Sequence, residues 1–191
     1  VGFSYSSSVS NSYSSGGVTG NFGVGGLVGQ STSSSVLNSF STGAVTGTTD
    51  VGGLIGDSTN SPVSNSFSTG AVTGTTVVGG LIGDYGSGTI TDTFWNNHSG
   101  NVNQTFGTGS NINVTTIDDN ISRFYENSLL PMSNWDPAIW DFYNTTLPHL
   151  AYENYVVAST PTPSNSVSIT SLPSFGVGAI VGAMKFQNKK R

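Results

Sequence analysis

Few side chains in this sequence are spaced for chemistry. Asp57 and Asp84 occupy equivalent positions 27 residues apart, and Gln30 lies a further 27 residues upstream. Two carboxylates on neighbouring strands repel each other unless they face water or share a cation. A calcium site needs about six or more oxygen ligands, and only these acids recur. We therefore expect ordinary exposed aspartates rather than a calcium site or the acid pair of a glycosidase.

Other reactive residue types also lack a suitable arrangement. His98 and His149 are the only histidines and have no metal-ligand spacing. Serine is abundant, but no Gly-x-Ser-x-Gly motif singles out a nucleophile. Cysteine is absent, which excludes disulfides and thiolate metal sites. We predict no catalytic, cofactor-binding or metal-ligating residues, no cofactor, and no enzymatic activity.

The charge distribution argues against a nucleic-acid partner. Residues 1–122 contain neither Lys nor Arg, and four of the five basic residues lie at positions 185–191. Phosphate binding needs clustered cations, which the body of the chain lacks. Charged residues make up only 8% of the sequence, whereas Ser and Thr together account for 54 of its 191 residues. This composition favours strands and turns over helices.

A 27-residue repeat organises the first half of the sequence. Asn11, Asn38, Asn65 and Asp92 each begin a unit, and the second and third units differ over their first twenty residues only at Asp50 and Val77. We assign a partial unit to residues 1–10 and complete units to 11–37, 38–64 and 65–91. Because the chain begins inside a unit, we interpret it as a fragment or a processed product.

The repeat predicts an all-β fold, a right-handed parallel β-helix over residues 1–91 with 27-residue coils stacked ~4.8 Å apart. We expect about three short strands per coil, from candidate segments 39–42, 44–46, 51–55 and 62–64. Glycines such as Gly43 and Gly70 are expected at corners with positive φ. The asparagines should form an amide ladder along the axis. The expected internal stacks are Tyr13/Phe40/Phe67/Phe94, Val18/Val45/Val72, and Val28/Ile55/Ile82 joined by Leu27/Leu54/Leu81.

The strings VGGLVG at 24–29 and VGGLIG at 51–56 and 78–83 resemble the GLUG motif, named for Gly-Leu-x-Gly. The preceding NSFSTGAVTG segments are similar to the rest of that repeat. The resemblance extends over roughly residues 1–150. It implies a large surface or secreted protein, of adhesin-like type or accompanying a peptidase. It supplies no catalytic residues, because the motif is architectural.

Residues 92–157 are predicted to form an α+β cap that seals the open end of the solenoid. Thr116, Asp118 and Asp119 offer capping side chains for a short helix whose apolar positions would include Ile117, Ile121, Phe124 and Leu129. Trp135, Trp140, Phe142 and Leu150 would add apolar area. A carbohydrate-binding aromatic platform is the alternative for the tryptophans, and packing is the interpretation we favour.

The C-terminal tail changes composition sharply. Residues 158–174 form a Ser/Thr/Pro-rich linker, and residues 175–191 an apolar segment with a basic end. The segment is shorter than the ~20 apolar residues of a membrane span. LPSFG at 172–176 is similar to a sortase signal, although Phe175 replaces the threonine at the cleaved bond. A weak membrane tether, a cell-wall sorting signal and a disordered end all remain open.

These features predict a non-catalytic structural or adhesive repeat protein, extracellular or on the cell surface, whose partner is a cell-surface protein or a glycan. The alternative is an accessory region of a larger secreted peptidase or polysaccharide-acting enzyme.

Overall fold

The computed structural model describes residues 1–97, 106–108, 114–118, 125, 127–128, 132–143 and 145–154. Contacts divide the chain into two units, Val1–Tyr155 and Val156–Arg191. All described residues lie in the first unit. The predictions for the linker at 158–174 and for the segment at 175–191 fall outside them.

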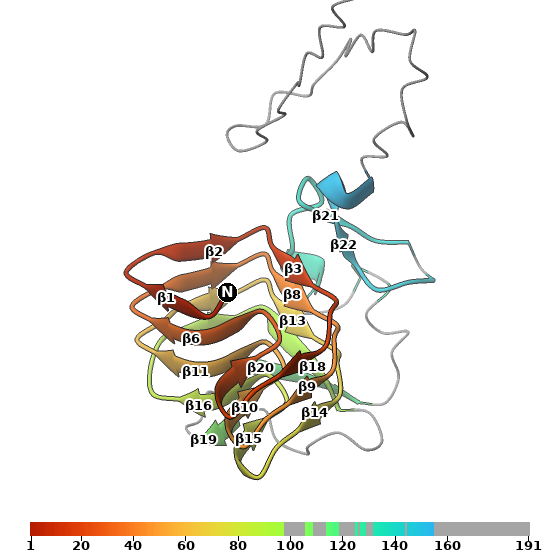
Figure 1. Cartoon of the computed structure of the whole chain (residues 1–191). Coiled ribbons are helices and arrows are strands. Elements are labelled where there is room, and N and C mark those ends of the chain that lie inside the picture. Colours follow the sequence, from red (N-terminus) through yellow and green to blue (C-terminus); the bar gives the residue numbers. More distant parts are fainter. Residues whose placement is uncertain are drawn as a thin grey trace, which may run out of the picture. The chain divides into compact units, whose positions relative to one another are not determined.

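The first unit is an all-β solenoid whose strands pair in parallel with a shift of 27 residues (Figure 1). Phe40 of one coil pairs with Phe67 of the next, and Val45 pairs with Val72. The fold class and the repeat length predicted from the sequence are therefore confirmed. The right-handedness of the solenoid stays a prediction.

Each complete coil contains five short strands rather than about three. The central coil comprises β8 (Phe40–Ser41), β9 (Val45–Thr46), β10 (Thr49–Gly52), β11 (Ile55–Thr59) and β12 (Val63–Ser64). The expected single strand at 51–55 is divided between β10 and β11, because the chain bends at Gly53 and Leu54. The preceding coil comprises β3 (Tyr13–Ser14), β4 (Val18–Thr19), β5 (Phe22–Gly25), β6 (Val28–Thr32) and β7 (Ser35–Leu37).

The following coil comprises β13 (Phe67–Ser68), β14 (Val72–Thr73), β15 (Thr76–Gly79), β16 (Ile82–Tyr85) and β17 (Ile90–Thr91). Ahead of the complete coils, β1 (Phe3–Tyr5) and β2 (Ser8–Ser10) pair with β6 and β7. After them, β18 (Thr93–Asn97), β19 (Phe106–Thr108) and β20 (Val114–Asp118) extend the ladders. Parallel pairing thus continues beyond residue 91, the predicted end of the repeats.

Two apolar columns of side chains fill the interior of two lobes. One lobe encloses Val28, Ile55, Ile82 and the leucines of the motif, and the other encloses Val45, Val51 and Val72. Leu54, Ile55 and Val45 have no exposed surface. The two predicted aliphatic stacks are confirmed.

Close packing between coils explains the glycines of the Gly-Gly-Leu-x-Gly segment. A Cβ on Gly53 would overlap Ser68 Oγ and the carbonyl oxygen of Gly80. The glycines at the corners are also required by close packing, because a Cβ on Gly43 would overlap the carbonyl oxygen of Gly16. Gly43 and Gly70 are not among the positive-φ residues, so that prediction was wrong. Glycine is needed there for close approach. The positive-φ positions are occupied by asparagine, aspartate, serine, valine and two other glycines, Gly23 and Gly88.

The C-terminal part lies beside the solenoid and packs on one lateral face (Figure 1). It contains two 3-10 turns, Met132–Asn134 and Ala151–Asn154, and an antiparallel pair, β21 (Trp140–Asp141) with β22 (His149–Leu150). The expected helix does not start at Thr116, because Val114–Asp118 is strand β20, which pairs with β18. The rest of that expected helix, at 119–124 and 129, falls outside the described residues.

The predicted register of the aromatic stack is confirmed. The prediction that its rings point into the solenoid is wrong. Phe40 and Phe67 are stacked with ring centroids 4.7 Å apart and planes within 1°. Phe67 also packs on Trp135 and Trp140, at 6.0 and 5.8 Å. The following residue, Ser68, faces the interior beside Gly53. Side chains alternate along a strand, so the phenylalanines point outward and are buried by the C-terminal segment.

Candidate functional site

The asparagine column is a structural ladder. Asn38 Nδ2 donates to Asn11 Oδ1 at 3.1 Å, and Asn65 Nδ2 donates to Asn38 Oδ1 at 3.2 Å. All three asparagines have a left-handed backbone conformation, with φ between 46° and 48°. Asparagine tolerates this conformation better than most residues do. Asp92 occupies the same position in the next coil, with φ 47°, and accepts from Asn134 Nδ2 at 2.7 Å. The predicted amide ladder is confirmed, because each amide donates a hydrogen bond to the equivalent asparagine of the neighbouring coil.

The acidic column lies on β11 and β16, where Asp57 pairs with Asp84 and with Gln30. Gln30 Nε2 donates to Asp57 Oδ2 at 3.4 Å. Burial raises the pKa of Asp57 above its ordinary value, the charge of Asp84 adds to that rise, and hydrogen bonds from Thr59 and Gln30 oppose it. Asp50 is 6% exposed, and its pKa is raised by burial and then by Asp84 and Asp57.

No group of three or more His, Cys, Asp or Glu side chains among the described residues has the geometry of a metal site. The acidic column places the like charges of Asp57 and Asp84 on neighbouring strands, where they repel each other. Of the two histidines, His98 falls outside the described residues. His149 is half-buried on β22, with its ring 6.2 Å from that of Tyr143.

The stack of Tyr13, Phe40, Phe67 and Phe94 lies on the outer face of the repeats, and we call it the outward aromatic ladder. Phe67 and Phe94 have no exposed surface, and Trp135 and Trp140 lie over them at 3% and 1% exposure. Trp135 Nε1 donates to the carbonyl oxygen of Asp92 at 2.8 Å, which fixes the indole to the turn before β18. Packing is thus the role of Trp135 and Trp140, as favoured from the sequence.

Tyr13 is the member of the ladder that is not buried. Its ring stacks on Phe40 at 5.2 Å yet is 47% exposed. Beside it lies a groove of about 330 Å³ whose walls include Phe40 on one side and Leu147, Pro148 and His149 on the other. Sequence reasoning placed Tyr13 inside the solenoid, because spacing along the chain does not distinguish the two faces of a strand.

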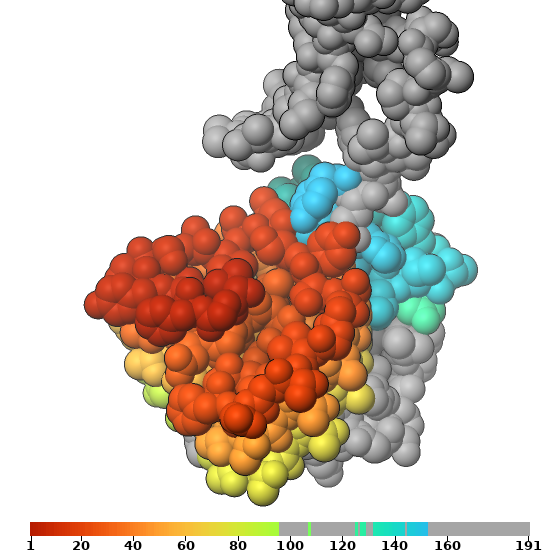
Figure 2. Space-filling model, in the orientation of Figure 1, coloured from red at the N-terminus to blue at the C-terminus, as the bar shows by residue number. Residues whose placement is uncertain are grey.

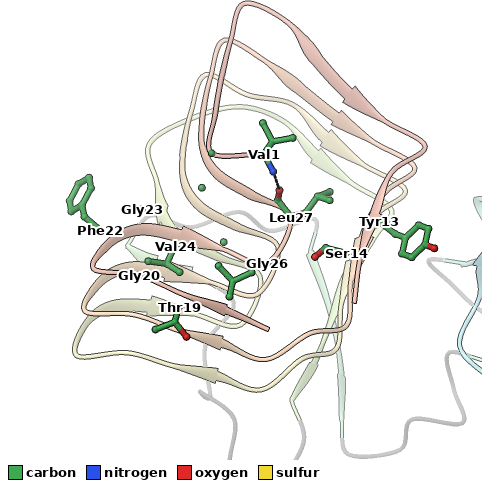
Figure 3. A pocket seen from close by; sticks show the side chains of 14 residues that line it. Val1, Tyr13, Ser14, Thr19, Gly20, Phe22, Gly23, Val24, Gly26 and Leu27 are labelled. Atoms are coloured by element: carbon green, nitrogen blue, oxygen red, sulfur yellow. Dashed lines mark hydrogen bonds between the residues drawn. The ribbon is translucent and has the colours of Figure 1, made fainter. Parts of the chain in front are cut away.

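A larger hollow opens at the first coil (Figure 3). Its volume is about 640 Å³, and its walls include Val1 and Gly2 above and residues 18–20 and 22–27 below. Ser14 points toward the hollow, whereas Tyr13 and Phe22 point away from it (Figure 3). Val1 N donates to the carbonyl oxygen of Leu27 at 2.7 Å, which repeats the bond from Val28 N to Leu54 O. Nothing in the sequence pattern pointed to this hollow, whose walls include the first two residues of the sequence.

These features define a class of protein, a repeat protein with a parallel β-solenoid fold and stacked side-chain ladders. Residues 20–46 match the model of the GLUG motif. The resemblance noted from the Gly-Leu-x-Gly strings is therefore confirmed for one full repeat length. Neither the curated proteins nor the solved structures contain a match to the chain.

Proposed function

We propose that this chain is a non-catalytic structural and adhesive repeat protein, extracellular or attached to the cell surface. The observation that carries the proposal is the outward aromatic ladder. The same stripe that stacks from coil to coil also holds a separate segment, through Trp135 and Trp140, by ring stacking. We infer that such a stripe can hold a segment of a partner in the same manner on coils that the chain's own segment does not cover.

The recurring polar columns support a structural role. Ser39 Oγ accepts from Ser12 N at 3.2 Å, and Ser66 Oγ accepts from Ser39 N at 3.1 Å. Together with the asparagine ladder, these bonds use the repeated polar groups to hold one coil to the next. A rod of this kind serves as a spacer whose length grows with the number of coils.

The partner we propose is a cell-surface protein or glycan rather than a nucleic acid, because residues 1–122 contain neither Lys nor Arg. The tail is proposed to retain the chain at the cell surface, weakly in a membrane or at the cell wall. Among the described residues no helix has both the length and the apolarity to cross a membrane.

The test is expression of the chain in its source cells with and without residues 172–191, followed by separation of envelope, medium and cytosol. We expect the full chain in the envelope fraction and the truncated chain in the medium. A cytosolic chain, or equal partitioning of both forms, would contradict the proposal. Hydrolysis of casein or of a bacterial polysaccharide by the purified chain would contradict its non-catalytic part.

A further inference from the structure

The outward aromatic ladder offers the same ring to the covering segment, the described residues between 132 and 154, in successive coils. Phe40, Phe67 and Phe94 stack on one another at 4.7 and 5.0 Å, with planes within 3°. Trp135 lies on both Phe67 and Phe94. Figure 2 shows residues of the segment, in cyan and blue, against the side of the repeats. Stacking alone therefore does not determine on which coil the segment docks.

The position that begins each repeat unit distinguishes the coil of Phe94 from the coils before it. Asn38 and Asn65 carry amides that donate and accept along the ladder, so Asn38 Oδ1 already accepts from Asn65. Asp92 holds the equivalent position with the same left-handed backbone, but a carboxylate only accepts hydrogen bonds. A carboxylate also binds a donor more strongly than a neutral amide oxygen does. Asp92 therefore offers an acceptor that the asparagine coils do not.

Two adjacent residues of the covering segment contact Asp92. Asn134 Nδ2 donates to Asp92 Oδ1 at 2.7 Å, and Trp135 Nε1 donates to the carbonyl oxygen of Asp92 at 2.8 Å. By contrast, Tyr152 donates to the main-chain carbonyl of Asn11, a group that every coil offers. The bond from Asn134 thus depends on the identity of a solenoid side chain, whereas a bond to a main-chain carbonyl does not.

The covering segment has main-chain hydrogen bonds of its own. Trp140 N donates to the carbonyl oxygen of Asp136, and Ala151 N donates to that of Ile139. Strands β21 and β22 also pair with each other. The two bonds from the segment to Asp92, in contrast, come from side chains. A unit attached in this way can open locally while the solenoid stays folded.

We propose that Asp92 and Phe94 form a recognition site for an Asn-Trp pair, and that Asp92 selects the coil on which the covering segment docks. The carboxylate accepts the side-chain amide of Asn134, and the ring of Phe94 supports the indole of Trp135. A coil with asparagine at this position provides the ring and lacks the charged acceptor. The inference builds on the docking role proposed for the outward aromatic ladder. It concerns the chain's own segment, so its test needs no partner and can fail independently of the cell-surface proposal.

Amide hydrogen exchange of the 191-residue chain, resolved by NMR, tests this site. The amides of Trp140 and Ala151 report opening of the covering segment, and those of Val45 and Val63, which bond to the next coil, report the solenoid. Asn134→Asp brings two carboxylates together and should speed exchange in the segment by about tenfold. Asp92→Asn makes this coil equivalent to the asparagine coils and should speed it by about threefold. Exchange in the solenoid should not change, and a segment unaffected by either variant would overturn the proposal.

Reversing the pair tests the contact itself. When Asp92→Asn and Asn134→Asp are combined, the amide at position 92 donates to the carboxylate at position 134, so exchange in the segment should return close to that of the unmodified chain. The matched controls are Asp57→Asn and Asn60→Asp, at positions whose side chains bond within the repeats. Both controls should leave exchange in the segment unchanged. A double variant that opens as readily as Asn134→Asp alone would overturn the proposal.

Trp135→Phe tests the indole half of the site. It keeps a ring on Phe94 and removes the donor to the carbonyl oxygen of Asp92, so the segment should exchange about tenfold faster. This variant replaces Asn134→Asp if that chain does not fold, which fast exchange at Val45 and Val63 would show. Unchanged exchange at Trp140 and Ala151 in the Trp135→Phe chain would contradict the site.

Discussion

Two kinds of side-chain stack run along this solenoid with the same 27-residue register, and they are buried in different ways. Ile55 lies on Val28 and Ile82 inside a lobe, where its own coil and its neighbours enclose it. Phe67 lies on Phe40 and Phe94 on the outer face, where the described residues that pack over the stack are Tyr125 and residues of the segment 132–150. The inner stack is therefore a property of the repeat alone, and the outer stack depends on residues 132–150. Strand spacing dictates stacking on both faces of a sheet, so burial of a stack does not show that it lies inside.

The largest expected effect concerns the outer stack. Phe67→Ala removes a fully buried ring that contacts Phe40, Phe94, Trp135 and Trp140, and should lower the free energy of unfolding by ~3–5 kcal/mol. Thermal unfolding of the two chains measures the difference. Thr75→Ala, at an exposed position of the same coil, should cost under ~0.5 kcal/mol. Equal melting temperatures for the two variants would show that the outer face is not buried as described.

The sequence was sufficient to predict the register, the aliphatic stacks and the asparagine ladder, because a near-identical repeat requires equivalent residues to lie above one another. It was insufficient to predict the direction of Phe40 and Phe67. In a strand of two residues such as β8, alternation gives no pattern from which a face can be assigned. The covering segment carries no repeat, so its place beside the solenoid could not be inferred. No local pattern encodes the hollow or the exposure of Tyr13.

A second prediction concerns the asparagine ladder, which links one coil to the next. Asn38→Ala removes the bonds to Asn11 and from Asn65 and places a Cβ-bearing residue without a polar side chain at φ 48°. We expect a loss of about 1–3 kcal/mol in the free energy of unfolding, from the hydrogen bonds and the backbone strain. Asn38→Gly loses the same amide but accepts the left-handed backbone, and should lose less. Chemical denaturation of both variants measures the difference, and a larger loss for glycine would be the contrary result.

The smallest effect concerns the acidic column outside the lobes. The pKa of Asp57 is raised in the folded chain by burial and by Asp84, so the folded state holds its proton more firmly than the unfolded state does. The contribution of this group to stability is present below the unfolded pKa near 3.8 and is lost as pH rises through the raised folded pKa. Asp57→Asn removes the carboxylate whose ionisation destabilises the folded chain. It should therefore raise the free energy of unfolding at pH 7 by up to about 1 kcal/mol. Its advantage should disappear near pH 3, and a variant that is less stable at pH 7 would disagree with this account.

The distinction between inner and outer stacks is tested most directly by a double-mutant cycle for unfolding, with Trp135→Ala as the common variant. Phe67 and Trp135 are in contact across the outer face, at 6.0 Å between ring centroids. Combining Phe67→Ala with Trp135→Ala should therefore give a coupling energy of about 0.5–3 kcal/mol. Ile55 belongs to a separate cluster inside the lobe, so Ile55→Ala and Trp135→Ala should add to within about 0.5 kcal/mol. Additivity for Phe67 together with coupling for Ile55 would contradict the outward direction of the aromatic ladder.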